Sequence, residues 1–160
     1  FARAGGRTVI SLRAGEAVPA LPAEIAACRE LGLVFRRLPL RGHRLPSRAE
    51  LRAARQLFAA AERPVLMHCQ SGADRAGFAA ALWLLFEGRP PAEARRQLSP
   101  RYGHNPLGRA GLLDAFLDAC AASPLPFADW VETAYDPERI TAAWRATGLA
   151  GRLRLWLARR

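Results

Sequence analysis

Residues 67–78 read MHCQSGADRAGF, and this stretch decides the fold. The residues just before it, 64–68, form a short apolar run that is typical of a buried strand. Residues 75–86, which overlap the end of this stretch, are strongly apolar and predict a helix. Cys69 directly follows the first segment, Arg75 begins the second, and five residues separate them. The pattern therefore predicts a strand that ends in a tight loop and continues directly into a helix.

A loop of this kind is suited to bind an anion. Its successive backbone N–H groups converge on one point, and the N-terminus of the following helix adds a partial positive charge. Arg75 adds a planar guanidinium that can pair with two phosphate oxygens at once. We therefore expect the phosphate to be bound by Gln70, Ser71, Gly72, Ala73, Asp74 and Arg75.

The same positive field favours a thiolate on Cys69. Cysteines at helix N-termini near cations have pKa values lowered from about 8.5 to roughly 3.5–7.5. A thiolate held against a phosphoryl group is an activated nucleophile, and the loop donors stabilise the phosphoryl oxygens in the transition state. The alternative is that Cys69 is a small buried apolar residue and Arg75 a surface cation, which makes the spacing of His68, Gly72 and Arg75 accidental.

Outward from this loop, strands and helices alternate in the first half of the chain. Strands are expected at residues 7–12, 33–40 and 64–68, and helices at 22–31, at 47–61 behind a Ser47–Glu50 capping box, and at 75–86. The second half predicts helices at 91–98, 107–121, 127–135 and 137–147. The predicted fold class is α/β, with a small, mostly parallel central sheet flanked by helices and a helical C-terminal half.

The composition fits one domain over residues 1–160, with a peripheral basic tail at 149–160. The chain is 51% apolar and 24% charged, and all 24 of its basic residues are arginines, which leaves a net charge of +10. The arginines are dispersed and no nucleic-acid-binding signature is present, so no nucleic-acid partner is expected. The amphipathic tail is a candidate for peripheral contact with an anionic membrane surface.

Cysteine and histidine are sparse. Three scattered cysteines without a CxxC pair fit a reducing, cytoplasmic setting, and three histidines without a ligand spacing predict no metal and no cofactor. No apolar run reaches the 18 or so residues of a transmembrane helix.

Residues 68–77 resemble the HCxxGxxR signature of the cysteine-dependent protein tyrosine and dual-specificity phosphatases. Small bacterial members of the dual-specificity class are similar over a wider range, most of residues 7–135. They also have a V-I-x-L-R strand, a P-V-L-x-H-C strand and a later RYGH…GxLD segment, which match residues 9–13, 64–69, 101–104 and 111–114 here. The late position of Cys69 differs from low-molecular-weight tyrosine phosphatases and arsenate reductases, which carry a similar loop after the first strand.

The resemblance implies a phosphatase-like fold and a two-step reaction on a phosphoprotein or a small phosphorylated substrate. Cys69 attacks phosphorus, and water then hydrolyses the cysteinyl-phosphate, while His68 braces the loop. A phosphoinositide or phospholipid phosphatase, or a catalytically weak phosphate-binding pseudophosphatase, are the alternatives.

The general acid is where the sequence departs from the resembling families. Many of them supply an Asp from a loop upstream of the cysteine strand, but residues 39–47, PLRGHRLPS, hold no carboxylate, and no Asp precedes Asp74. Myotubularins carry Cys-x-x-Gly-x-Asp-Arg, as this chain does, and their loop Asp is assigned the acid role. Asp74 is therefore the expected acid; the alternatives are that it braces Arg75 or a neighbouring helix, or selects the substrate. His43 is the reserve acid.

Two further departures concern turnover and substrate. Ala76 stands where the family usually has a Ser or Thr that assists turnover, so slow hydrolysis of the phosphoenzyme is expected. Ala73 stands where inositide-directed relatives often place a Lys, which weakens the case for a highly phosphorylated inositide. Four arginines could compensate if they line the cleft, namely Arg41, Arg44, Arg101 and Arg109. The RYGH segment could cover the cleft, hold the loop or simply be a turn.

Overall fold

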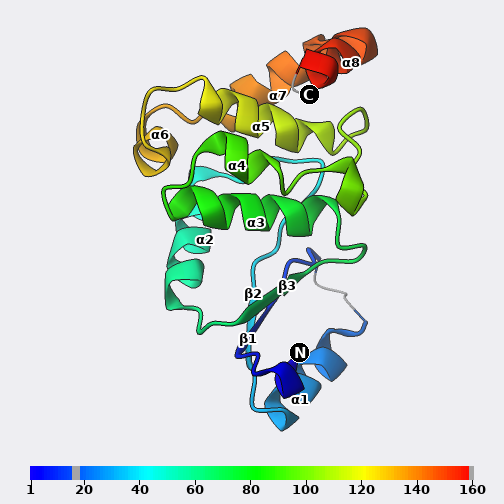
Figure 1. Ribbon diagram of the computed structural model, residues 1–160, viewed down its shortest axis with the longest axis vertical. Helices are drawn as coiled ribbons and strands as arrows, with labels where there is room; N and C mark the ends of the chain where they lie inside the picture. The colour runs from blue at the N-terminus through cyan, green and yellow to red at the C-terminus, as the bar shows by residue number, and fades with distance from the viewer. Residues whose placement is uncertain (16–18, 159–160) are drawn as a thin grey trace.

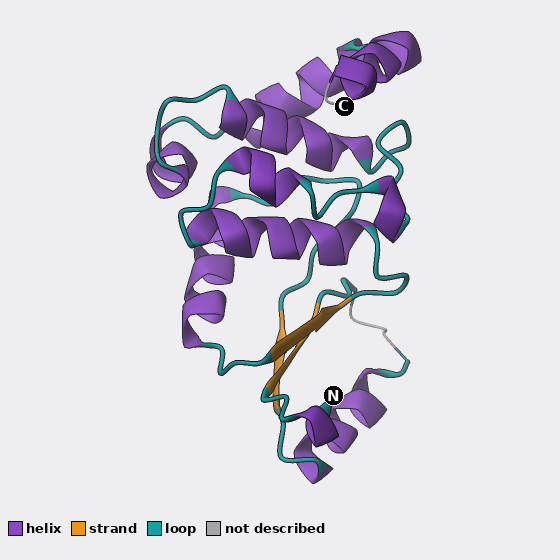
Figure 2. Cartoon of the chain, in the orientation of Figure 1, coloured by secondary structure: helices purple, strands orange, loops and turns teal. Residues whose placement is uncertain are grey.

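The computed structural model describes residues 1–15 and 19–158, and its centre is a three-stranded parallel sheet (Figures 1 and 2). The strands are β1 (Thr8–Ser11), β2 (Val34–Arg37) and β3 (Val65–His68), in the order β2-β1-β3. Thr8 is in register with Val34 on one side and with Val65 on the other. All four residues of β1 are buried, as a central strand covered on both faces requires.

Helices make the crossovers that parallel strands need. The segment from β1 to β2 contains α1 (Leu21–Glu30), which contacts β2, and the segment from β2 to β3 contains α2 (Arg48–Ala60). The predicted capping box is confirmed, because Ser47 Oγ accepts from the Glu50 N–H and the Glu50 carboxylate accepts from the Ser47 N–H. Directly after β3 comes α3 (Asp74–Phe86), which contacts that strand.

The second half of the described chain adds helices that stack on α3, away from the sheet (Figure 1). They are α4 (Pro91–Arg95), the 3₁₀ turn η2 (Pro100–Tyr102), α5 (Gly111–Ala121), α6 (Phe127–Thr133), α7 (Pro137–Ala146) and α8 (Gly148–Ala158); a first 3₁₀ turn, η1 (Ala2–Ala4), precedes β1. Contacts run from α3 to α4, from α4 to α5 and from α5 to α7. This stack fixes the loops that face the start of α3.

Aromatic rings fill the centre of the helical stack. Phe116 on α5 meets Phe78 on α3 edge-on, with 5.1 Å between ring centroids, and meets Trp130 and Tyr135 at 5.3 Å each. Phe78, Phe116 and Tyr135 have almost no exposed surface. Burial of these large rings, together with their edge-to-face geometry, holds α3 against α5.

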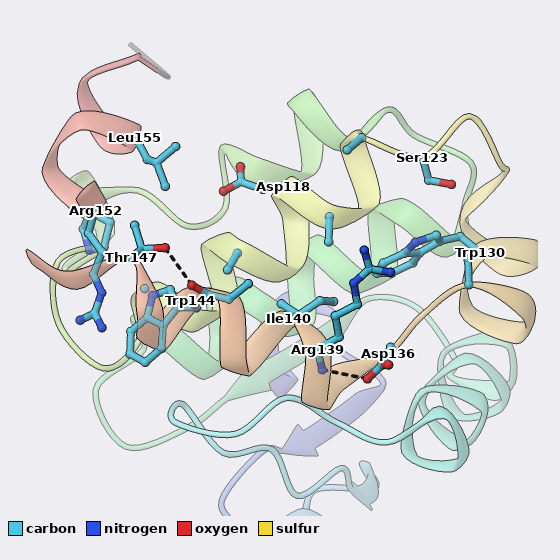
Figure 3. A pocket seen from close by; sticks show the side chains of 17 residues that line it. Asp118, Ser123, Trp130, Asp136, Arg139, Ile140, Trp144, Thr147, Arg152 and Leu155 are labelled. Atoms are coloured by element: carbon cyan, nitrogen blue, oxygen red, sulfur yellow. Dashed lines mark hydrogen bonds between the residues drawn. The ribbon is translucent and has the colours of Figure 1, made fainter. Parts of the chain in front are cut away.

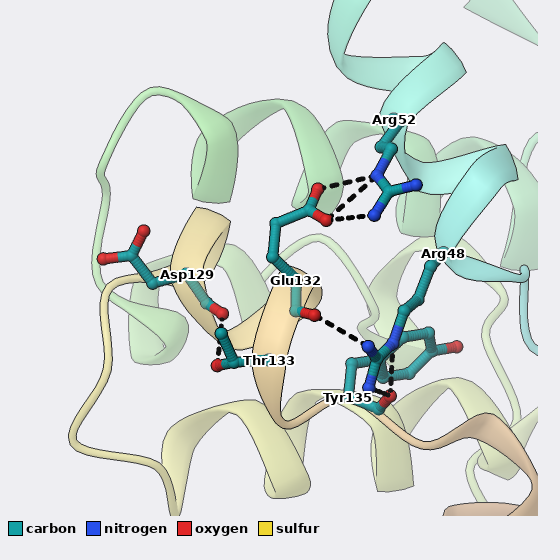
Figure 4. Close-up of polar contacts among 6 residues, drawn as sticks. All are labelled: Arg48, Arg52, Asp129, Glu132, Thr133 and Tyr135. Atoms are coloured by element: carbon teal, nitrogen blue, oxygen red, sulfur yellow. Dashed lines mark hydrogen bonds and ion pairs between the residues drawn. The ribbon is translucent and has the colours of Figure 1, made fainter.

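Polar contacts tie α2 to the residues around α6 (Figure 4). The Arg48 guanidinium donates to the Tyr135 carbonyl at 2.8 and 3.0 Å and to the Glu132 carbonyl at 2.7 Å, and Arg52 forms an ion pair with Glu132. The buried Tyr135 hydroxyl donates to the Pro46 carbonyl at 2.6 Å. These bonds anchor the segment between β2 and α2 on the helical half.

The predicted fold class is confirmed, and the differences lie at element ends. Helix α5 begins at Gly111 rather than at residue 107, because the chain first turns back on itself. The Leu107 N–H donates to Asn105 Oδ1, and a Cβ on Gly111 would lie 2.0 Å from the Pro106 carbonyl oxygen. Helix α4 ends at Arg95 rather than at residue 98. The predicted tail is α8 up to Ala158, and its last two residues lie outside the described part.

Candidate active site

The loop between β3 and α3 folds around the sulfur of Cys69. The strand ends at His68 and the helix begins at Asp74, so residues 69–73 make the whole connection. The backbone N–H groups of Ser71, Gly72 and Ala76 donate to the Cys69 sulfur. Gly72 has a φ of 71°, which favours glycine and turns the loop so that these donors converge.

Opposing effects act on the pKa of the Cys69 thiol. Burial raises it, since the side chain is 9% exposed, but the three N–H donors and the nearby Arg75 guanidinium lower it, and the net direction is downward. The other two cysteines behave in the opposite way. Burial raises the pKa of Cys28, and it raises the pKa of Cys120 to about 11. Cys69 is therefore the cysteine poised to be a thiolate.

His68 supports the loop from the strand side. Its Nδ1 lies 3.3 Å from the Cys69 carbonyl oxygen, its Nε2 is paired with Glu24 on α1, and its own carbonyl accepts from the Leu12 N–H at 2.8 Å. Glu24 belongs to the site because α1 passes close enough for this carboxylate to reach the imidazole.

Asp74 stands at the first residue of α3 and is held by a buried histidine. Asp74 Oδ1 lies 2.7 Å from His104 Nδ1, and His104 Nε2 lies 2.7 Å from Asp114 Oδ2. Behind them, Arg95 Nη1 lies 3.7 Å from Asp114 Oδ1. Burial lowers the pKa of His104, but the hydrogen bonds and charges of Asp114 and Asp74 outweigh it and raise that pKa overall.

Close backbone approaches bring His104 to Asp74. Gly103, with a φ of 83°, ends the 3₁₀ turn, and a Cβ on it would lie 3.5 Å from the Ala73 Cβ. On α3, a Cβ on Gly77 would lie 2.4 Å from the Gln97 carbonyl oxygen, so only glycine allows this approach. The RYGH segment is thus a turn that also holds the loop.

Asp114 has a part in the site that the sequence argument missed. The resemblance marked Asp114 only as part of a recurring segment. The available signal was an Asp among the apolar residues of a predicted helix, which also carries Asp118, since a buried carboxylate needs a partner.

A cleft of about 400 Å³ opens beside the loop. Its wall includes Asp74 and Arg75 together with Arg41, His43 and Arg109, and Asp74 is the one carboxylate among the lining residues. Two predicted cleft arginines are placed differently: Arg44 is paired with Glu50, and Arg101 lies on exposed η2 outside the lining. The loop residues Gln70 and Ser71 are exposed and do not line this cleft.

A cavity of about 570 Å³ lies elsewhere, among α5, α7 and α8 (Figure 3). No residue of the loop after β3 lines it. Within residues 1–15 and 19–158, no group of three or more His, Cys, Asp or Glu side chains is placed to hold a metal ion. None of the helices that the structure describes has the length and apolar character to span a membrane.

We predict that one thiol titrates below the ordinary cysteine value. The rate at which iodoacetamide alkylates the native protein should rise with pH around a midpoint below that of an ordinary cysteine, because the Cys69 thiolate is stabilised and the pKa of Cys69 is lowered. Cys69→Ser should remove this phase and leave only slow alkylation at high pH, since the pKa values of Cys28 and Cys120 are raised. Arg75→Met should shift the midpoint upward. A phase that persists in Cys69→Ser would contradict the assignment.

Comparisons with known proteins agree with a phosphatase-like fold. Residues 26–96, from α1 to just beyond α4, match the model of the tyrosine phosphatase family. The chain resembles the crystal structure of a provisionally assigned phosphatase from Neisseria meningitidis z2491, with a TM-score of 0.52 and 26% identity, over 71% of this chain and 80% of the other.

Two curated proteins also match, both named beta-lactamase hydrolase-like protein, from two strains of Xylella fastidiosa. Each is 36% identical over 113 residues, which are 69% of this chain and 26% of the relative. The chain thus spans about a quarter of the length of these relatives. The strand-loop-helix arrangement, the parallel sheet and the family match over residues 26–96 agree in their resemblance to the tyrosine-phosphatase-like superfamily.

Proposed function

We propose that this chain is a cysteine-dependent phosphatase that hydrolyses phosphomonoesters on a protein or a small molecule. One observation carries the proposal: the Cys69 sulfur accepts from three backbone N–H groups at the start of α3, beside Arg75. Within the described chain Arg75 has no ion-pair partner, so its guanidinium is available to a phosphate. The nucleophile and the phosphate-binding groups are therefore assembled before the substrate arrives.

The first step forms a bond between Cys69 sulfur and phosphorus while the bond from phosphorus to the ester oxygen breaks. The loop N–H groups and Arg75 stabilise the charge on the three remaining phosphoryl oxygens. In the second step, water attacks phosphorus, the phosphorus–sulfur bond breaks, and inorganic phosphate leaves with the thiolate restored. No metal or cofactor takes part in this scheme.

Asp74 is the proposed proton donor in the first step and acceptor in the second. It lines the cleft beside Arg75, and its side chain is 35% exposed, so it can reach a leaving oxygen. His104 acts as a positioning residue, because its bond to Oδ1 fixes the carboxyl group and can hold a proton between the two side chains. A phosphoryl dianion in the loop attracts that proton toward Asp74, which lies on the cleft wall while His104 does not.

A phosphate-binding protein with weak catalysis is the second candidate, and Ala76 favours it. At this position only the backbone N–H faces the Cys69 sulfur, without the hydroxyl that assists turnover in the resembling enzymes. Binding without turnover would use the same loop.

We expect the wild-type chain to hydrolyse p-nitrophenyl phosphate. Cys69→Ser should reduce the rate to background, and Arg75→Met should lower kcat/KM by about 10²–10³-fold, because it removes a donor to the transferring phosphoryl group. Cys28→Ala is the matched control and should keep full activity, since Cys28 lies on α1 outside the cleft. No hydrolysis by the wild type between about pH 5 and 8, with phosphate still protecting Cys69 from alkylation, would favour the phosphate-binding candidate.

The role of Asp74 is tested by comparing two substrates with different leaving groups. Asp74→Asn should slow hydrolysis of glycerol phosphate by about 10²–10⁴-fold, because an alkoxide needs a proton to leave. It should slow p-nitrophenyl phosphate far less, because p-nitrophenolate is a stable leaving group. Asp129→Asn, on the exposed face of α6, is the control. An equal effect of Asp74→Asn on both substrates would mean that Asp74 is not the acid, and His43 would then be tested.

Ala76 predicts slow release of phosphate from the enzyme. Rapid mixing with p-nitrophenyl phosphate should give a burst of nitrophenol close to one equivalent of enzyme, followed by a slower steady state. Ala76→Ser should raise the steady rate by about tenfold, the equivalent of one hydrogen bond of roughly 1.4 kcal/mol. A linear time course without a burst would show that hydrolysis of the intermediate is not limiting.

A further inference from the structure

A second cavity adjoins the cleft beside the phosphate loop. It has a volume of about 240 Å³ and is lined by His43, Arg109, Trp144 and Arg145. His43 and Arg109 also line the 400 Å³ cleft that contains Asp74 and Arg75. The two cavities therefore share part of their walls.

The second cavity is built from three separate parts of the chain. His43 comes from the loop between β2 and α2, Arg109 from the turn before α5, and Trp144 and Arg145 from α7. The Trp144 ring is held by Arg152, whose guanidinium carbon lies 3.8 Å from the ring centroid (Figure 3). The helical stack therefore fixes the wall of this cavity relative to the phosphate loop.

The arginines that line the two cavities have no acidic partner within the part of the chain that the structure describes. Arg41, Arg109 and Arg145 have no ion pair within the described chain, and the second cavity has no carboxylate in its lining. Elsewhere, ion pairs with carboxylates are formed by Arg44, Arg52, Arg63, Arg89 and Arg95. Clustered guanidinium groups repel one another, and an anion bound between them removes that repulsion.

We propose that the cavity lined by His43, Arg109, Trp144 and Arg145 is a second anion subsite. The preferred substrate is then a phosphomonoester that carries a second phosphate close to the one that is hydrolysed. This inference rests on the proposed function, because it assumes that the loop at Cys69 holds the scissile phosphate. Arg109, on the wall of both cavities, lies between the two phosphates, and Arg145 contacts the second one alone.

The test compares two competitors that differ by one phosphate. Inositol monophosphate and a vicinal inositol bisphosphate are each measured as inhibitors of p-nitrophenyl phosphate hydrolysis by the wild-type chain, so the result does not depend on their own turnover. The bisphosphate should bind at least about tenfold more tightly, as one added charge-assisted contact predicts. This preference should shrink as salt is added, because the subsite is open to solvent.

Single arginine variants show which residues cause the preference for the bisphosphate. Arg145→Gln should reduce the preference for the bisphosphate toward one, whereas Arg139→Gln, on the same helix but outside both cavities, should leave it unchanged. Arg109→Gln should also reduce it. Equal inhibition by the two compounds in the wild type, or a preference that survives both Arg109→Gln and Arg145→Gln, would overturn the proposal.

Two further measurements separate the subsite from the proposed function and from binding to a membrane. If p-nitrophenyl phosphate is not hydrolysed, the proposed function fails, and calorimetric titration with the same two compounds still decides the subsite. Vesicles that carry a phosphatidylinositol bisphosphate distinguish a lipid headgroup from a soluble compound. Discrimination by the soluble pair assigns the effect to the two phosphates, and discrimination confined to vesicles would overturn the subsite in favour of a membrane contact.

Discussion

The convergence of backbone N–H groups on the Cys69 sulfur is the constraint on which the rest of the structure depends. These donors belong to a loop that closes within a few residues between β3 and α3, so the strand and the helix must meet at a fixed angle. A loop with many unpaired donors is stable only when an anion, here the thiolate or a phosphate, lies at its centre. The sheet on one side and the helical stack on the other hold it in that shape.

The helical second half has a direct part in this arrangement. It supplies His104 and Asp114, and these two side chains connect Asp74 to the interior between α4 and α5. A buried imidazole between two carboxylates is fully satisfied only in one geometry, which fixes the carboxyl group at the cleft. Catalysis, under the proposed function, therefore depends on residues that lie thirty or more positions after the loop.

Much of the fold followed from local signals. The apolar runs of β1 and β3, the capping box at Ser47 and the apolar pattern of α3 each act within a few residues, so they could be read directly. The ends of α4 and α5 could not, because the close contact of Gly111 with Pro106 is a tertiary event. Likewise, no local pattern indicates that α1 brings Glu24 to His68, because that contact joins two distant parts of the chain.

What the sequence determined by itself was the chemistry of the loop: a cysteine, a glycine and an arginine at fixed spacing, followed by a helix. That information is local, and a strand, a loop and a helix suffice to express it. Only the tertiary structure decided which distant groups face the loop. In the tertiary structure, His104 holds Asp74 and Arg44 is paired with Glu50. Arg109 and Arg145 line one cavity there. Such choices depend on how helices far apart in the chain pack together, and no short-range pattern encodes that packing.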